Sequence, residues 1–116
     1  MRDPLRQFKA EFFKALAHPA RIKILESLRT GEKSVNELQT LLALDPSSVS
    51  QQLAVLRARN IVEARKVGTS AFYRVRDPLI FELLDVARRI FNNHLMDTRS
   101  MLEQLGEEEA EKTSKG

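Results

Sequence analysis

The sequence contains no cysteine, no long apolar run and few residues suited to catalysis. Without cysteine the chain can form no disulfide, no thiolate metal site and no thiol redox switch. No apolar segment approaches the length that spans a bilayer, and the N-terminus lacks the apolar core of a signal peptide. We therefore expect a cytoplasmic protein that has no membrane partner.

The usual sequence signals of an enzyme are also missing. There is no glycine-rich phosphate-binding loop, the chain has two histidines, and no nucleophile is paired with a base. Ser50, for example, has no neighbour in the sequence that could accept its proton. The sequence therefore predicts a protein that is not an enzyme and that needs no cofactor.

Charge is distributed unevenly along the chain. Residues 1–76 hold 14 Lys and Arg against 7 Asp and Glu, whereas residues 77–116 hold 5 against 9. Between residues 46 and 76, a segment that we call the basic block, Glu63 is the one acidic residue, and the cations are Arg57, Arg59, Arg65, Lys66, Arg74 and Arg76. The chain as a whole, with its 116 residues, is long enough for one domain. A basic segment within it is typical of nucleic-acid binders, although it also occurs as plain solvated surface.

The segment 45–59 is predicted to be the helix that contacts DNA. Asp45 suits an N-cap and Pro46 the first helical position. Val49, Leu53 and Leu56 recur on one face, which would pack against a core. The other face carries small polar side chains and amides and then cations: Ser47, Ser48, Ser50, Gln51 and Gln52, followed by Arg57 and Arg59. Such a face can bond to base edges while its cations meet phosphate, although alone it also fits an ordinary solvated helix.

Three further helices are predicted before this segment. The first begins at Asp3 and ends at His18, because the residue before a proline is disfavoured in the α region. The second begins at Pro19 and closes at Gly31 as a left-handed cap. Ser34–Glu37 has the form of a capping box that starts the third helix. The third helix, a tight turn and the segment 45–59 together form a helix-turn-helix.

After Asn60 the pattern changes to two strands, 61–67 and 71–75, which flank Gly68, Thr69 and Ser70. This pattern predicts a β-hairpin with a glycine at its tip, and Arg65 and Lys66 lie in the tip region. A hairpin directly after a helix-turn-helix is the wing of a winged helix. Its cations can contact the DNA backbone or the minor groove.

The last predicted helix starts at Asp77-Pro78 and keeps an apolar stripe as far as Gly106, which is expected to end it. A small domain cannot cover so long a stripe, so we expect a homodimer through the first and last helices, although the aromatic first helix could instead pack on its own domain. The expected interface residues are Leu5, Phe8, Phe12, Phe91, Leu95 and Leu102. Residues 1–105 would then form the domain, and residues 106–116 a charged, disordered tail.

Several of these segments occur in a characteristic order: Phe13–Leu25, Val35–Leu38, Ser47–Arg57, Ile61–Val62 and Gly68–Val75. Over roughly residues 8 to 95 they resemble the ArsR/SmtB family of bacterial winged-helix transcriptional repressors. The resemblance implies a mainly α fold with a β-hairpin, a homodimer, and a DNA affinity that falls when an inducer binds. By position, it implies DNA contacts from Ser47, Ser48, Ser50, Gln51 and Gln52 on the helix and from Arg65, Lys66, Gly68 and Thr69 on the wing.

The metal sites of that family are not matched. Relatives that hold thiophilic metals use a cysteine pair on the helix before the recognition helix, where this chain has Val35–Leu42 without sulfur. Others bind zinc-like ions between the two last helices through two pairs of ligands. Here His94 and Asp97 have the spacing of the second pair, but Phe81 and Leu83 stand where the first pair is expected. Two ligands would not close a tetrahedral site. His18 is expected to hold a helix junction rather than a metal. The effector stays open between a small molecule at the dimer interface, an unfamiliar metal site, a protein partner and none.

The sequence thus predicts a sequence-specific regulator, a repressor that binds double-stranded DNA at an inverted repeat as a dimer. The alternative is a winged helix that binds a protein and no specific DNA. That alternative predicts a neutral or acidic recognition face, whereas this face continues into Arg57 and Arg59. DNA binding is therefore favoured.

Overall fold

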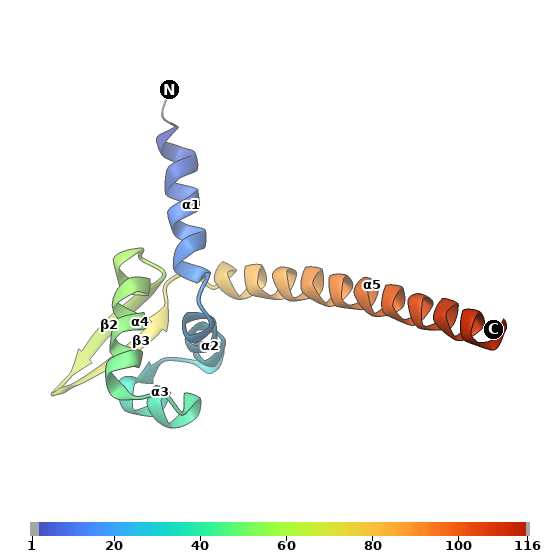
Figure 1. Cartoon of the computed structure of the whole chain (residues 1–116). Coiled ribbons are helices and arrows are strands. Elements are labelled where there is room, and N and C mark those ends of the chain that lie inside the picture. The colour runs from blue at the N-terminus through green and yellow to red at the C-terminus, as the bar shows by residue number, and fades with distance from the viewer. Residues whose placement is uncertain (1–2, 116) are drawn as a thin grey trace. The chain divides into compact units, whose positions relative to one another are not determined.

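The computed structural model describes residues 3–115, which form two compact units that divide after Phe81 (Figure 1). The elements of the first unit are α1 (Pro4–Leu16), α2 (Pro19–Ser27), the 3₁₀ helix η1 (Leu28–Thr30), β1 (Lys33–Ser34), α3 (Val35–Leu42), α4 (Pro46–Ala58), β2 (Val62–Val67) and β3 (Ser70–Val75). The helix α5 (Leu79–Lys115) begins in this unit and makes up the described part of the second. The fold is mainly α with a small sheet, as predicted.

Side-chain caps fix where the helices begin. Asp3 accepts a hydrogen bond from the backbone of Arg6 at the start of α1, and Asp45 accepts one from Ser48 at the start of α4. At the α1–α2 junction, Nδ1 of His18 accepts from the amide of Ala20 at 3.1 Å. This bond confirms that His18 holds the junction. The capping box between Ser34 and Glu37 at the start of α3 is also confirmed.

One apolar core holds the first unit together, and α4 packs in it against α2, α3 and β2. The buried apolar side chains are Ala15, Leu16, Ile24, Leu25, Leu28, Leu38, Val49, Leu53, Leu56, Ile61, Val62 and Ile80. Val49, Leu53 and Leu56 are almost fully buried, which confirms the predicted inner face of α4. Because these three side chains lock the rotation of α4 about its axis, they also decide which residues face outward.

The wing is the hairpin of β2 and β3, joined by the two residues Gly68 and Thr69. Gly68 has φ +62°, a conformation that glycine adopts without strain. The sheet has a third strand that the sequence analysis missed: β1 pairs antiparallel with β3 and gives the order β1-β3-β2. A strand of two residues carries no alternating pattern long enough to recognise.

Two predicted helix ends are wrong. The helix α2 ends at Ser27 and continues as η1, and Gly31 follows with φ +130° and ψ 177°, which is not the left-handed helical cap. The helix α5 does not end at Gly106 but runs on to Lys115, so the expected tail is helical as far as it is described; Gly116 lies outside the described residues. A single glycine costs an exposed helix only about 1 kcal/mol, and the Glu and Ala residues after it favour helix. No described helix, α5 included, combines the length and the apolar character needed to cross a membrane.

Candidate nucleic-acid interface

The N-terminus of α4 is organised by Asp45. Its carboxylate accepts from the backbone amide of Ser48 at 2.8 Å and from the hydroxyls of Ser47 and Ser48 at 2.7 and 3.1 Å. The hydroxyl of Ser47 and then the two groups of Ser48 lower the pKa of Asp45 from its ordinary value. Because both hydroxyls donate to Asp45, they keep only acceptor capacity toward a ligand.

Ser50 and Gln51 lie further along the exposed face of α4. Neither side chain makes a hydrogen bond within residues 3–109, whose side chains the structure describes. Arg57, in the last turn of the helix, is also exposed and forms no ion pair in the same range. Together these three side chains leave donors, acceptors and a cation available on one helix.

Gln52 differs from its neighbour. It is half-buried, and its Oε1 accepts a hydrogen bond from Nη1 of Arg21 at 2.9 Å. The sequence interpretation placed it with the DNA-contacting residues, but the structure commits its amide oxygen to α2. The sequence does contain a signal for this inward position. Gln52 lies three residues after Val49 and four before Leu56, both of which are buried, so the helical period places it beside the buried face.

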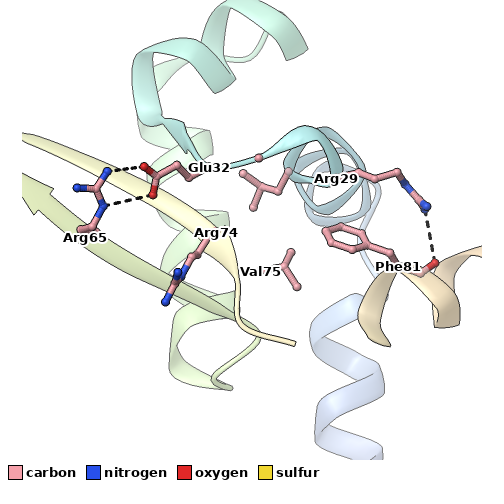
Figure 2. A pocket seen from close by; sticks show the side chains of 8 residues that line it. Arg29, Glu32, Arg65, Arg74, Val75 and Phe81 are labelled. Atoms are coloured by element: carbon pink, nitrogen blue, oxygen red, sulfur yellow. Dashed lines mark hydrogen bonds and ion pairs between the residues drawn. The ribbon is translucent and has the colours of Figure 1, made fainter. Parts of the chain in front are cut away.

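Arg65 on the wing is engaged within the protein, as Figure 2 shows. One edge of its guanidinium meets the carboxylate of Glu32, with Nε donating at 3.3 Å and Nη2 donating to Oε1. The guanidinium also lies 5.7 Å from the centre of the Phe72 ring, opposite it on β3. The hydrogen bond from Arg65 lowers the pKa of Glu32, and Glu32 in turn raises the pKa of Arg65.

A shallow groove of about 490 Å³ lies beside this ion pair. It is lined by Leu28, Arg29, Gly31, Glu32, Arg65, Arg74, Val75 and Phe81. The guanidinium of Arg29 lies 5.2 Å from the Phe81 ring and donates to the Phe81 carbonyl at 3.5 Å, on the side away from Arg65 (Figure 2). Arg29 and Arg65 thus bond to different partners, and their guanidinium groups do not converge on one point of the groove.

Most cations of the basic block are matched by carboxylates, which the sequence analysis missed. Glu63 bonds to Arg74 at 3.0 Å and lies 3.6 Å from Arg76. Arg59 pairs with Glu11 of α1 at 3.2 Å, and Arg65 pairs with Glu32. Within the described residues, Arg57 and Lys66 are the two members of the block that form no ion pair. Lys66 is exposed on the wing, and so is Thr69 at the turn beside it.

The residues expected at a dimer interface are mostly exposed in the single chain. On α1, Leu5 and Phe8 are exposed and Phe12 is half-buried, with its ring edge-on to Phe13 at 5.6 Å between centroids. On α5, the exposed large apolar side chains are Leu79, Val86, Ile90, Phe91, Leu95, Met96, Met101, Leu102 and Leu105. Each helix therefore presents apolar surface that its own unit leaves uncovered.

The described residues do not fit the metal sites of the family that the sequence resembles. The helix α3 has no sulfur ligand, and His94 and Asp97 both lie exposed on α5. Among residues 3–109, whose side chains the structure describes, no three His, Cys, Asp or Glu side chains are grouped closely enough to hold an ion. We therefore assign no metal role to these side chains.

A helix-turn-helix followed by a hairpin wing defines the winged helix-turn-helix class of DNA-binding regulators. Residues 18–64 match the family described as bacterial regulatory protein, arsR family. The chain is 48% identical over 104 residues to the uncharacterized HTH-type transcriptional regulator Rv0081 of Mycobacterium tuberculosis, an alignment that covers 89% of this chain and 91% of that relative. The chain therefore belongs to the arsR family, and it is a DNA-binding transcriptional regulator.

Solved structures agree with this assignment. The crystal structure of Rv0081 has a TM-score of 0.75 to this chain, with 83% of this chain and 97% of the other covered. The homodimeric winged helix-turn-helix DNA-binding domain of Mb0332 from Mycobacterium bovis, a possible ArsR-family regulator, is 30% identical; its TM-score is 0.71, with 79% and 85% covered. The transcriptional repressor BigR from Xylella fastidiosa is 36% identical, with a TM-score of 0.65 and coverage of 71% and 84%.

Proposed function

We propose that two copies of this protein bind an inverted repeat in DNA and repress transcription from it, with α4 of each copy in the major groove. The observation that carries the proposal is the exposed face of α4, where Ser50 and Gln51 have unused hydrogen-bonding groups and Arg57 an unpaired charge. Small hydroxyls and amides discriminate base edges, whereas cations hold phosphates. Ser47 and Ser48 would add acceptors at the start of the helix, since their protons face Asp45.

On the wing, we assign phosphate contacts to Lys66 and Thr69 first. Both are exposed, and Lys66 forms no ion pair within the described part of the chain. Arg65 would bind phosphate with its remaining donors, or with the Nε–Nη2 edge after exchanging Glu32 for the DNA, because that edge is already bonded. Phosphate can replace a carboxylate in such a pair, since both accept the same fork of donors.

The homodimer in the proposal is supported by the apolar surfaces of α1 and α5. Phe8 and Phe91 each leave 64% of their surface exposed, as do Leu95 and Leu102. Apolar surface of this extent on a monomer commonly marks a protein interface. The winged helix-turn-helix DNA-binding domain of Mb0332 is homodimeric. A twofold dimer would place two copies of α4 about one helical turn of DNA apart, which is the reason for an inverted repeat.

The test is a titration of the DNA upstream of its own gene, with binding followed by fluorescence polarisation and the stoichiometry by sedimentation. We expect two chains on each inverted repeat and an affinity that falls steeply between low and moderate salt. A random duplex of equal length is the control for sequence-independent binding. No binding at low salt would refute DNA recognition and would favour a winged helix that binds protein.

A further inference from the structure

We infer that Arg21 is a positioning residue that fixes the recognition helix α4 to α1, and that Gln52 serves this link rather than a base. The guanidinium of Arg21 joins three elements. Its Nε donates to the Ala15 carbonyl at 2.6 Å and its Nη2 to the Lys14 carbonyl at 3.3 Å, both near the C-terminal end of α1. Its Nη1 donates to Oε1 of Gln52 on α4 at 2.9 Å.

The chemistry of these partners makes the link specific. The last carbonyls of a helix have no intrahelical donor and carry the negative end of the helix dipole, so a cation suits them. A guanidinium can only donate hydrogen bonds, and therefore the atom of Gln52 that faces it must be the amide oxygen. The planar fork of Arg21 can hold α1 and Gln52 together because its donors diverge in one plane.

The position of Gln52 on α4 supports the same role. It lies on the flank of the buried stripe formed by Val49 and Leu56, and it is half-buried. Gln51, one residue earlier, lies on the exposed face. Successive residues differ by about 100° around a helix, so one of two adjacent glutamines can face a neighbouring helix while the other faces solvent. Of the two glutamines, Gln51 is therefore the one that we assign to a base.

Polar links matter here because little apolar packing holds α1. Within α1, only Ala15 and Leu16 are buried, both at its C-terminal end. A second link joins the same two helices, since Arg59 at the end of α4 pairs with Glu11 at 3.2 Å. A hollow of about 170 Å³, lined by Glu11, Lys14, Ala15, Arg21, Val55 and Arg59, lies between the two links. The Arg21–Gln52 bond therefore restrains the angle between α1 and α4 where side-chain packing leaves space.

The functional consequence rests on the proposed dimer. If α1 lies at the dimer interface, the angle between α1 and α4 sets the separation of the two recognition helices on the DNA. Loss of the Arg21–Gln52 bond would then relax the required spacing between half-sites. It would leave the bases read within each half-site unchanged.

The experiment measures binding of the full chain to duplexes whose two half-sites are separated by spacers that differ by single base pairs, and to one isolated half-site. The variants are Arg21→Met and Gln52→Leu, with Lys23→Met as the matched control, because Lys23 is an exposed cation on the same helix. For both test variants we expect the preference for the best spacer over its neighbours to fall about tenfold, as for the loss of one hydrogen bond to a charged group. Affinity for the isolated half-site and its base preferences should stay at the wild-type level, as should all properties of Lys23→Met.

Three outcomes test the inference about Arg21 and the proposed function separately. An unchanged spacer preference in both variants would overturn the role of Arg21, while wild-type binding to the inverted repeat would still support the proposed function. A changed preference at one base pair in Gln52→Leu would show that Gln52 contacts a base, and would also overturn the inference. Absence of wild-type binding to any inverted repeat would refute the proposed function and the inference with it. If Arg21→Met does not fold, Arg21→Lys keeps the charge without the fork and takes its place.

Discussion

Replacement of Lys66 by alanine should lower DNA affinity for all sequences alike and should weaken its dependence on salt. Lys66 is exposed on β2 and, within the described residues, pairs with no carboxylate, so its charge is fully available to phosphate. Each phosphate contact adds about 0.9 to the slope of log affinity against log salt concentration. The proposed dimer carries two copies of Lys66, so the slope should fall by about 1.8.

This change in slope corresponds to a measurable difference in affinity. Between about 50 and 200 mM salt, the ratio of wild-type to variant affinity should shrink about twelvefold. The assay is fluorescence polarisation with one inverted-repeat duplex and one scrambled duplex over that range. The variant should lose affinity for both duplexes by the same factor, because a phosphate contact carries no sequence information.

The matched control is Lys23→Ala, which removes the same charge from an exposed position on α2. It should leave the slope at the wild-type value. An equal loss of slope in both variants would mean that net charge alone drives binding, and an unchanged slope in Lys66→Ala would remove the wing from the interface. Either result would refute our reasoning about Lys66.

Three further predictions concern α4. Gln51→Ala should reduce the discrimination at one base pair by about 1–3 kcal/mol. The measurement is competition with singly substituted operators. An unchanged sequence preference would contradict the role assigned to Gln51. Leu53→Ala should lower the free energy of unfolding in urea by about 2–5 kcal/mol, because the side chain is fully buried; a smaller loss would mean that the core collapses around the site. Asp45 has a lowered pKa in the folded state, so the stability that its carboxylate provides is present above its ordinary value of 3.8 and is lost as the pH falls through the folded value. Unfolding of Asp45→Asn should therefore differ from wild type near neutral pH and converge on it in acid, and a constant difference would argue against the cap as the cause.

Local signals predicted much of the fold. The caps at Asp3, His18 and Asp45 and the box at Ser34 depend on residues two or three apart, so the sequence alone reveals them. The burial of α4 follows from its apolar period, and the hairpin follows from its central glycine. These elements also defined the winged helix without knowledge of its tertiary contacts.

The pairing of charges could not be predicted in the same way. Arg65 meets Glu32 from 33 positions away, and Arg59 meets Glu11 from 48 positions away. No local pattern encodes such contacts, because they depend on how the helices and the sheet pack. The two-residue strand β1 was missed for the same reason, since it exists only through its pairing with β3. Only the three-dimensional structure therefore shows which of the side chains proposed for DNA contact are already bonded within the protein and which are not.

The matched charges of the basic block affect how such a regulator would search a genome. Sequence-independent attraction to DNA grows with the number of cations free to displace counterions, and Arg59, Arg65, Arg74 and Arg76 are held by carboxylates of the same chain. The protein should therefore bind random duplex DNA more weakly than its basic sequence suggests. Random sites outnumber operators by about 10⁶–10⁹ to one, so internal pairing keeps a larger share of the molecules free to occupy the true site.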